Sequence, residues 1–600
     1  MSYKAPLKDM LFVMNELAGL HVVNTLPGCE DATPDTVEAV LEENAKFCGG
    51  VVAPLNGPGD KEPSYWHDGN VTTAKGFKEA FKSFAEAGWQ GVQHPVDFGG
   101  HGLPKLVATP CIEMLNAASI SFALVALLSD GAIEALLTAG SDAQKTTYLE
   151  PLISGKWTGT MNLTEPQAGS DLAAVRTRAV LQDDGTFKVF GTKIFITYGE
   201  HDLAENIIHL VLARTPDSPP GVKGISLFIV PKFLINADGS LGARNDVHCV
   251  SIEHKLGIKA SPTAVLQFGD HDGAIGTLVG EKNHGLEYMF IMMNAARFGV
   301  GMQGIGLAER SYQQAVAFAK DRVQSRDVAG SDGPVAIIRH PDVRRMLMSM
   351  RAHTEAARAL AYVGAGICDI AHHHPDAATR AANLAVYEYL VPVIKGWSTE
   401  MAQDVTRDGV QVHGGMGFIE ETGAAQHYRD AKILTIYEGT TAIQANDLVG
   451  RRTARDGGAT AMGIIAQVRA TEAQLAAMTD CAHGSDFQAI LRQLSEGRVA
   501  LESVVDYVAS NMKSDVKAVF SGSVLYLKLA GIVLGGWQMA RAAVVAQQKL
   551  DAGAGDAQFY KAKIGTARFF ADHILSQAPG LRAAIIDGSA GVLALTEDQF

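Results

Sequence analysis

The sequence predicts a multidomain α+β protein in which a β-rich middle domain lies between helical domains. Two patterns indicate this class. Apolar residues recur at helical spacing up to about residue 158 and again after about residue 276. Between these segments, short runs of β-branched and aromatic residues are separated by Gly, Asp and Pro. A chain of 600 residues has room for three or four domains. We place them at 1–158, 159–275, 276–455 and 456–600.

The N-terminal domain is expected to be mainly helical. Amphipathic spacing covers residues 8–20, 36–50 and 76–89, and Pro34 followed by an acidic turn is typical of a helix start. Residues 120–140 are strongly apolar and predict a buried pair of helices.

The middle domain is expected to be a compact antiparallel β-domain, because its strand-like runs follow one another without intervening helices. These runs lie at residues 156–165, 176–182, 186–197, 206–215, 223–233, 248–255 and 263–269.

Long helical patterns over residues 284–326 and 340–371 predict a helical bundle. A breaker stretch at 452–463 separates this bundle from the last helical segment. We interpret His372–His374 as a turn between helices and predict no metal site, since no acidic or Cys partner is spaced to complete one. The methionines of residues 288–294 and 344–350 are interpreted as helix core.

Charge and cysteine usage narrow the class of protein. There are 51 Lys and Arg against 65 Asp and Glu, a net charge of −14, which argues against nucleic-acid binding and a polybasic membrane anchor. We expect no apolar run long enough to cross a membrane, and no signal peptide at the start. The six cysteines include no CxxC pair and indicate free thiols in the cytoplasm.

The first motif with chemical content runs from Met161 to Asp171. It leaves an apolar segment and enters a Pro- and Gly-containing turn, where small residues and hydroxyls let backbone N–H groups approach a ligand. A plain loop between two domains explains the same residues equally well.

The second motif is a strand pattern, Gly191–Thr197. Alternation places Phe195 and Thr197 on one face and Ile194 and Ile196 on the other, so an aromatic ring and a hydroxyl could back a flat ring system. Taken alone, an ordinary edge strand is the simpler interpretation.

The third motif, Gln411–Gly417, follows a helix and could hold a pyrophosphate through backbone N–H groups. No strand precedes it, so it is not a dinucleotide-binding fingerprint, and a helix C-cap is the alternative.

The fourth motif is Ile436–Thr440. In it, Glu438 follows an apolar run and precedes a glycine, and a new helix is expected to begin just after it. A carboxylate among apolar residues is a candidate general base, because burial raises its pKa toward neutrality. An ordinary helix-entry carboxylate is the alternative.

Taken together, the order and spacing of these motifs resemble the acyl-CoA dehydrogenase family over roughly residues 60–452. TEPQAGSD resembles the first family signature, and HGGMGF with RDAKILTIYEGT resembles the second signature and catalytic loop. The resemblance implies a helical N-terminal domain, a β-barrel-like middle domain and a four-helix C-terminal domain, here followed by an extra C-terminal helical domain. It implies bound FAD and an acyl-CoA substrate.

The resemblance assigns roles residue by residue. Glu438 matches the catalytic base, and Arg297, Tyr437 and Ser170 match positions near the acyl-CoA. Positions near the flavin are matched by Met161, Leu163, Thr164, Gly169, Ser170, Phe195, Thr197 and Thr440. The adenosine and pyrophosphate positions are matched by Arg322, Gln411, Gly414 and Gly415. In the family the last group comes from a neighbouring subunit, so a homodimer is implied.

Four positions depart from the family pattern. Asn162 replaces a smaller residue, Gln426 replaces Lys or Arg, and Gln324-Ser325 replaces Thr-Phe. These changes put individual contacts to the adenosine half of FAD in doubt. They do not affect the chemistry at the flavin ring. Some relatives place the base beside the arginine matched by Arg297, but Ala296 stands there, so Glu438 is the predicted base.

The extra length resembles a long subgroup whose members include enzymes that oxidise 3-(methylthio)propanoyl-CoA to 3-(methylthio)acryloyl-CoA in dimethylsulfoniopropionate breakdown. The resemblance implies the same reaction, with an electron-transfer flavoprotein as acceptor. One alternative is a broad short- or medium-chain acyl-CoA dehydrogenase. A second is a catalytically idle, DNA-associated relative, which the balance of 13 basic and 14 acidic residues in 453–600 argues against.

Overall fold

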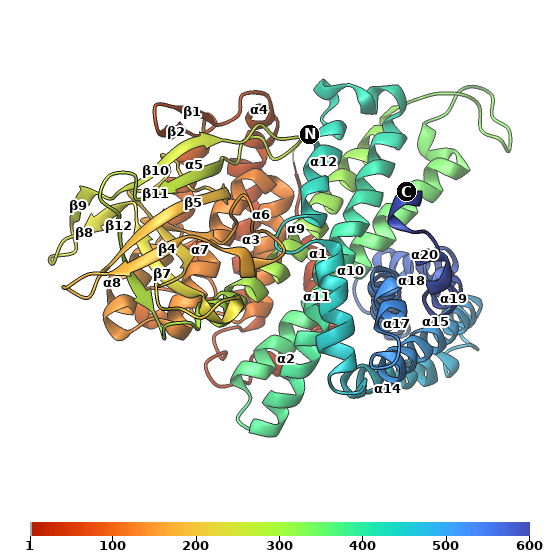
Figure 1. Ribbon diagram of the computed structural model, residues 1–600. Coiled ribbons are helices and arrows are strands. Elements are labelled where there is room, and N and C mark those ends of the chain that lie inside the picture. The colour runs from red at the N-terminus through yellow and green to blue at the C-terminus, as the bar shows by residue number, and fades with distance from the viewer. Residues whose placement is uncertain (1–2) are drawn as a thin grey trace.

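The computed structural model describes residues 3–600. A β-sheet domain lies beside an N-terminal group of helices, a bundle of long helices forms the centre, and the last helices pack on the outer side of that bundle (Figure 1). The predicted class, with helical, β-rich, helical and additional helical parts in that order, is therefore confirmed.

The N-terminal part consists of short and medium helices with one small hairpin. The helices are α1 Leu7–Glu16, α2 Leu20–Val23, α3 Pro34–Phe47, α4 Asn56–Lys61, α5 Phe77–Glu86, α6 Lys105–Ala118, α7 Ile120–Ala139 and α8 Asp142–Ile153, and the hairpin is β1 Tyr65–His67 with β2 Asn70–Thr72. Helix α3 begins at Pro34 as expected, with the Thr33 hydroxyl accepting a hydrogen bond from the N–H of Thr36.

The apolar segment 120–140 forms a single helix, so the predicted helix pair is wrong. Gly131 does not break the helix. A Cβ atom there would lie 3.0 Å from Met292 of another helix, so this glycine permits close packing within a continuous helix.

Two helices of the described chain are long and apolar enough to cross a membrane, α7 and α17 Ser523–Asp551, so the expectation of no such run is wrong. Their apolar windows are 72% and 89% buried inside the protein. A helix that is apolar on all sides and covered by other helices is typical of a protein core.

The middle sheet has the strand order β10-β11-β5-β12-β7-β6-β3, with β4 paired to β5. Its strands are β3 Trp157–Asn162, β4 Arg178–Leu181, β5 Phe187–Thr197, β6 Asn206–Ala213, β7 Ser226–Pro231, β10 Val247–Ile252, β11 Thr263–Phe268 and β12 Ala274–Val279, beside a small hairpin of β8 Phe233–Ile235 and β9 Leu241–Arg244. All pairs are antiparallel except β3 with β6, which is parallel, so the expectation of a purely antiparallel domain is wrong. Strand β12 runs across the boundary predicted at 275–276.

The sheet is attached to the helices where β3 passes α7. A Cβ atom on Gly159 would lie 2.4 Å from Cβ of Ala132, so only glycine lets the strand lie this close to the helix. This contact places the loop that follows β3 at the junction between the sheet and the helical parts.

The central bundle contains α9 Gly285–Asp321, α10 Pro341–His373, α11 Ala377–His413, α12 Ala424–Ala431 and α13 Thr441–Asp447. Met289, Met292, Met346 and Met350 are buried in it, which confirms their interpretation as helix core. His372 and His373 form the last turn of α10, and α11 begins three residues after His374, so only His374 lies in the connection and the prediction of a turn over all three histidines is wrong in its bounds.

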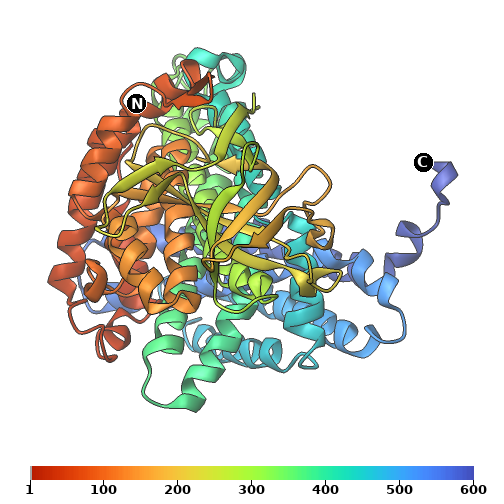
Figure 2. The same ribbon diagram turned by 60° about the vertical axis from the view of Figure 1, so that its left-hand side comes forward.

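The last helices are α14 Ala459–Ala476, α15 Gly484–Asn511, α16 Val516–Ser521, α17, α18 Ala557–His573, α19 Ala578–Asp587 and α20 Ser589–Val592. Figure 2 shows them along the side of the central bundle, with the C-terminus projecting away from it. Trp397 of α11 lies against Gly531 and Gly535 of α17, where added Cβ atoms would lie 2.2 and 2.6 Å from the indole. The extra domain thus covers an apolar face of the bundle.

A buried charge network joins the two ends of the chain. Arg358 of α10, 1% exposed, donates hydrogen bonds to Glu113 of α6 at 2.9 Å and to Asp9 of α1 and Glu309 of α9 at 2.7 Å each. Lys563 of α18 also bonds to Asp9. The extra domain is therefore tied by charge to the first helix as well as by apolar packing.

Replacing Arg358 should destabilise the fold strongly. In Arg358→Met, three buried carboxylates lose their guanidinium partner, which costs about 3–5 kcal/mol, and the midpoint of thermal unfolding falls. The control is Arg407→Met, which breaks an exposed pair with Asp404 and costs less than about 1 kcal/mol. Equal unfolding midpoints for the two variants would contradict this role of the network.

Candidate active site

Glu438 lies in a tight turn between two helical segments. The 3₁₀ segment Lys432–Thr435 precedes it, and α13 begins at Thr441 with Thr440 as its N-cap, as expected. The backbone φ of Glu438 is 54° and that of Gly439 is 86°, so both adopt the left-handed conformation. This conformation costs a non-glycine residue roughly 1–2 kcal/mol. The surrounding contacts must therefore hold Glu438 in place.

Two buried side chains hold the turn through its carbonyl groups. Lys395 of α11 donates from Nζ to the carbonyls of Leu434 and Gly439, both at 2.8 Å. Gln444 of α13 donates from Nε2 to the carbonyls of Glu438 at 3.1 Å and Gly439 at 3.3 Å. The carbonyls on both sides of Glu438 are thus fixed by side chains from two different helices. The sequence patterns pointed to neither Lys395 nor Gln444.

The Glu438 carboxylate is half-buried, and this desolvation raises its pKa, while the positive charges of Arg297 and Lys395 oppose the rise. Within residues 3–600, no group donates a hydrogen bond to its carboxylate oxygens or accepts one from its backbone N–H. A desolvated carboxylate with free oxygens and a raised pKa has the properties of a general base.

Arg297 interacts electrostatically with this carboxylate, and Tyr437 directly precedes it in the chain. Arg297 of α9 is 4% exposed and donates from Nη1 to Asp447 at 3.3 Å, while its Nε has no hydrogen-bond partner in the described chain. The Tyr437 hydroxyl donates to Gln303 of α9. Glu438, the arginine and the tyrosine therefore come together at the meeting point of α9, α11 and α13.

The predicted flavin-side loop begins at the end of β3. Met161 is buried within the strand, Leu163 and Thr164 are half-buried just beyond it, and Gly169 and Ser170 are exposed. The loop is therefore closed at its base and open at its tip, where a ligand can reach it.

A buried ion pair that the sequence patterns did not reveal fixes this loop. Lys193 of β5, 0% exposed, donates to Glu165 at 2.8 Å and to the carbonyl of Leu163 at 3.1 Å. Glu165 also accepts from the Thr177 hydroxyl and backbone, and its pKa is lowered to about 2, since these partners outweigh its burial. The N–H of Ile194 bonds to the carbonyl of Thr164 at 2.9 Å, so the loop lies directly beside β5.

Strand β5 presents Phe195 to solvent, with 59% of the residue exposed. The strict alternation expected here is wrong, because a β-bulge interrupts the pairing with β11 between Lys193 and Ile196. Both of those residues are buried, and Phe195 between them has φ of 60°. The bulge turns the aromatic ring outward beside the loop of the first motif, while Thr197 follows half-buried.

The remaining predicted cofactor residues lie elsewhere. Arg322 ends α9 and donates to Gln324 at 3.3 Å, and Gln411, Gly414 and Gly415 lie at the end of α11. All four are exposed. Contact between Phe318 and His413, with ring centroids 4.4 Å apart, brings these two helix ends together.

Within one chain this group is far from the base. Arg297 and Arg322 are separated by 25 residues of the α9 helix and its cap, which corresponds to roughly 37 Å at about 1.5 Å per residue. One protomer therefore carries the flavin-ring residues near one end of α9 and the adenosine residues near the other.

The residues present fit a flavin nucleotide. An exposed aromatic ring on β5 suits a flat heterocycle. Added Cβ atoms on Gly414 and Gly415 would meet nothing within 4 Å, so a phosphate can approach this backbone closely. Two of the departures do not face this group, since Asn162 is buried beside Thr160 and Gln426 bonds to the carbonyl of Asn56.

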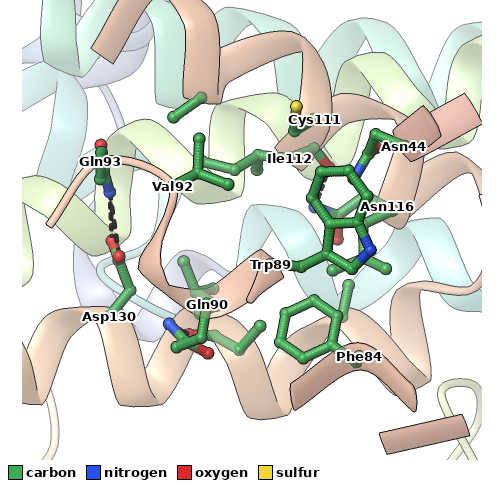
Figure 3. A pocket seen from close by; sticks show the side chains of 15 residues that line it. Asn44, Phe84, Trp89, Gln90, Val92, Gln93, Cys111, Ile112, Asn116 and Asp130 are labelled. Atoms are coloured by element: carbon green, nitrogen blue, oxygen red, sulfur yellow. Dashed lines mark hydrogen bonds between the residues drawn. The ribbon is translucent and has the colours of Figure 1, made fainter. Parts of the chain in front are cut away.

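A separate cavity lies inside the N-terminal part, between α3, α5, α6 and α7. Figure 3 shows Trp89, Phe84 and Ile112 on its apolar side and Gln93 bonded to Asp130 at its polar end. Its volume of about 60 Å³ holds a few water molecules and not an acyl-CoA. None of the predicted site residues lines it.

One surface cluster has the side chains of a metal site. Asp246, His248 and His271 place one ligand atom each within 4.8 Å of one another. Asp246 already accepts hydrogen bonds from both rings, at 3.2 and 3.0 Å, and from three backbone N–H groups. The cluster is satisfied by its own hydrogen bonds, and the absence of a metal site stays a prediction.

Family models match four consecutive segments of the chain. They are the acyl-CoA dehydrogenase N-terminal domain at residues 35–156, the middle domain at 160–271, the C-terminal domain at 283–453, and an acetyl-CoA dehydrogenase C-terminal-like domain at 464–596. The domain order of this family therefore covers nearly the whole chain, including the added helices.

Individual proteins are similar over their full length. The chain is 50% identical over 594 residues to the 3-methylmercaptopropionyl-CoA dehydrogenase of Ruegeria pomeroyi, with 99% of each chain covered. It is 35% identical to a butyryl-CoA dehydrogenase of Syntrophomonas wolfei, with 100% of this chain and 99% of that one covered.

A solved structure of an acyl-CoA dehydrogenase complexed with FAD from Bacillus anthracis shares the fold. Its TM-score is 0.73 at 21% identity, with 95% of this chain and 90% of that chain covered. On these grounds the chain belongs to the acyl-CoA dehydrogenase family of flavoprotein oxidoreductases.

Proposed function

We propose that this enzyme oxidises 3-(methylthio)propanoyl-CoA to 3-(methylthio)acryloyl-CoA, with FAD as its flavin and an electron-transfer flavoprotein as acceptor. The observation that carries the acyl-CoA chemistry is the Glu438 carboxylate, which is desolvated and free of hydrogen bonds. The methylthio substrate is supported by the 50% identical relative. Six free cysteines suit a cytoplasmic location.

The chain's own residues supply the proton transfer. Glu438 takes the α-proton of the acyl thioester, and burial suits it to this step because a raised pKa makes it a stronger base. When bound, the flavin accepts the β-hydrogen as hydride. Arg297 and Lys395 supply positive charge near the base and keep its ionised form accessible.

The turn at Glu438 also offers a donor for the developing enolate. The backbone N–H of Glu438 has no acceptor within residues 3–600. A free N–H on the residue that removes the α-proton is placed to stabilise the thioester oxygen, where negative charge grows. The left-handed conformation thus presents both the side chain and the N–H to one substrate.

A homodimer follows from the same proposal. The adenosine residues lie roughly 37 Å along α9 from the base, so a neighbouring protomer brings them to the flavin. Phe418, Met416 and Ile419, which follow Gly414 and Gly415, are 85%, 51% and 44% exposed. Exposed apolar residues next to the predicted adenosine-binding residues are typical of a subunit interface.

A short straight-chain acyl-CoA remains the alternative substrate, favoured by the butyryl-CoA dehydrogenase relative at 35% identity. 3-(Methylthio)propanoyl-CoA differs from butanoyl-CoA by one sulfur atom inserted between C3 and the terminal methyl group. They are therefore distinguished by rate and not by reaction type.

Glu438→Gln should bind flavin and stay yellow but lose turnover by about 10²–10⁴-fold, the usual contribution of a general base. Flavin absorbance and steady-state turnover measure the two properties separately. Glu421→Gln, at an exposed glutamate 17 positions earlier in the chain, serves as the control and should keep full activity. Turnover of Glu438→Gln near the wild-type rate would remove Glu438 as the base.

Anaerobic bleaching of the flavin by a panel of acyl-CoAs tests the substrate. The methylthio thioester should bleach the flavin faster than butanoyl-CoA at equal concentration. Much faster bleaching by butanoyl-CoA would overturn the methylthio proposal and leave the dehydrogenase chemistry in place.

Phe418→Asp should convert the dimer to monomer and lower flavin occupancy, because an interface cannot bury the added charge unpaired. Light scattering and the ratio of flavin to protein absorbance report the two effects. Val250→Asp, at a 45% exposed position of the middle sheet, should change neither. A dimeric, fully loaded Phe418→Asp protein would rule out this interface.

A further inference from the structure

We propose that Lys395 is the positioning residue of the catalytic base. It fixes the backbone carbonyls that flank Glu438, and its positive charge favours the ionised carboxylate. The proposal rests on the proposed role of Glu438 as base. It assigns a function to a side chain that is fully buried beneath the turn.

The geometry places Lys395 directly under the turn. Its Nζ donates to the carbonyl of Leu434, before the turn, and to that of Gly439, after Glu438, each at 2.8 Å. Lys395 thus spans the strained residue and fixes both of its flanks. Since Glu438 has φ of 54°, loss of these bonds removes a restraint on a conformation that is unfavourable by itself.

Lys395 is fully buried, with 0% of its side chain exposed. The extra C-terminal domain packs against the next residues of α11: a Cβ atom on Gly396 would lie 2.7 Å from Leu527 of α17, and Trp397 lies against Gly531. The added domain therefore covers α11 next to the lysine, which links it to the site.

The charged groups around Lys395 are few. Burial lowers its pKa to about 7, while Glu438 across the turn and Glu400 on the same helix raise it and Arg297 of α9 lowers it. A buried amine with an acid neighbour titrates together with that neighbour. The fall in rate at low pH (the acid limb of the pH–rate profile) therefore reports an apparent pKa of the Glu438–Lys395 pair, and not of Glu438 alone.

The sign of the effect follows from Coulomb's law. A nearby positive charge stabilises the carboxylate, so removing it raises the pKa of Glu438 and leaves less base ionised at a given pH. The loss of rate is then largest at low pH and fades above the new pKa. A lysine that only stabilises the fold would lower the rate equally at every pH.

The test is the pH dependence of flavin reduction by an acyl-CoA in the full-length, flavin-loaded enzyme. Lys395→Met removes the charge and both donors, and Lys395→Gln keeps amide donors without the charge. Both should move the acid limb up by about one pH unit, with roughly tenfold slower reduction below it. Lys395→Arg should keep the wild-type limb.

Lys432→Met is the matched control, because Lys432 lies on the 3₁₀ segment that precedes the Glu438 turn and is exposed. Its profile should match that of the wild type. An unshifted limb in both Lys395→Met and Lys395→Gln would overturn the proposal. So would loss of the folded, yellow form in both, because Lys395 would then be a stability residue alone. Activity in Glu438→Gln would instead overturn the base itself.

Discussion

The left-handed turn at Glu438 is the constraint on which the proposed chemistry of this protein depends. A carboxylate is an effective general base when its pKa lies near the working pH and it is held within reach of the proton. The turn achieves this at a cost in backbone energy, and Lys395 and Gln444 offset that cost by fixing its carbonyls. The packing of α9, α11 and α13 around the turn, and of α17 behind α11, supports these two side chains.

The length of α9 underlies the proposed dimer. Arg297 lies in its first half, and Arg322 caps its far end, which contacts the end of α11 through Phe318 and His413. A rigid helix keeps these two regions apart. Under the proposed dimer, a flavin nucleotide that touches both kinds of residue lies between chains, and the exposed Phe418 is the proposed contact.

Most of the fold could be predicted from periodicity, because long amphipathic helices and short β-runs are local patterns. The hairpin of residues 65–72 was missed although its Asp68-Gly69 pair, both at positive φ, is a known turn signal. The parallel pairing of β3 with β6 and the bulge at Phe195 depend on contacts distant in sequence. Glu438 could be found through its motif, whereas Lys395 and Lys193 could not, since a buried lysine has no local signature.

If Glu438 is the base, its carboxylate is the group nearest the substrate α-carbon. A crystal structure of the flavin-loaded enzyme with a bound acyl-CoA measures this distance. We expect a carboxylate oxygen of Glu438 about 3–3.5 Å from that carbon, with the turn still at positive φ and Lys395 still bonded to both carbonyls. A different carboxylate or a histidine at that distance, with Glu438 turned away, would contradict it.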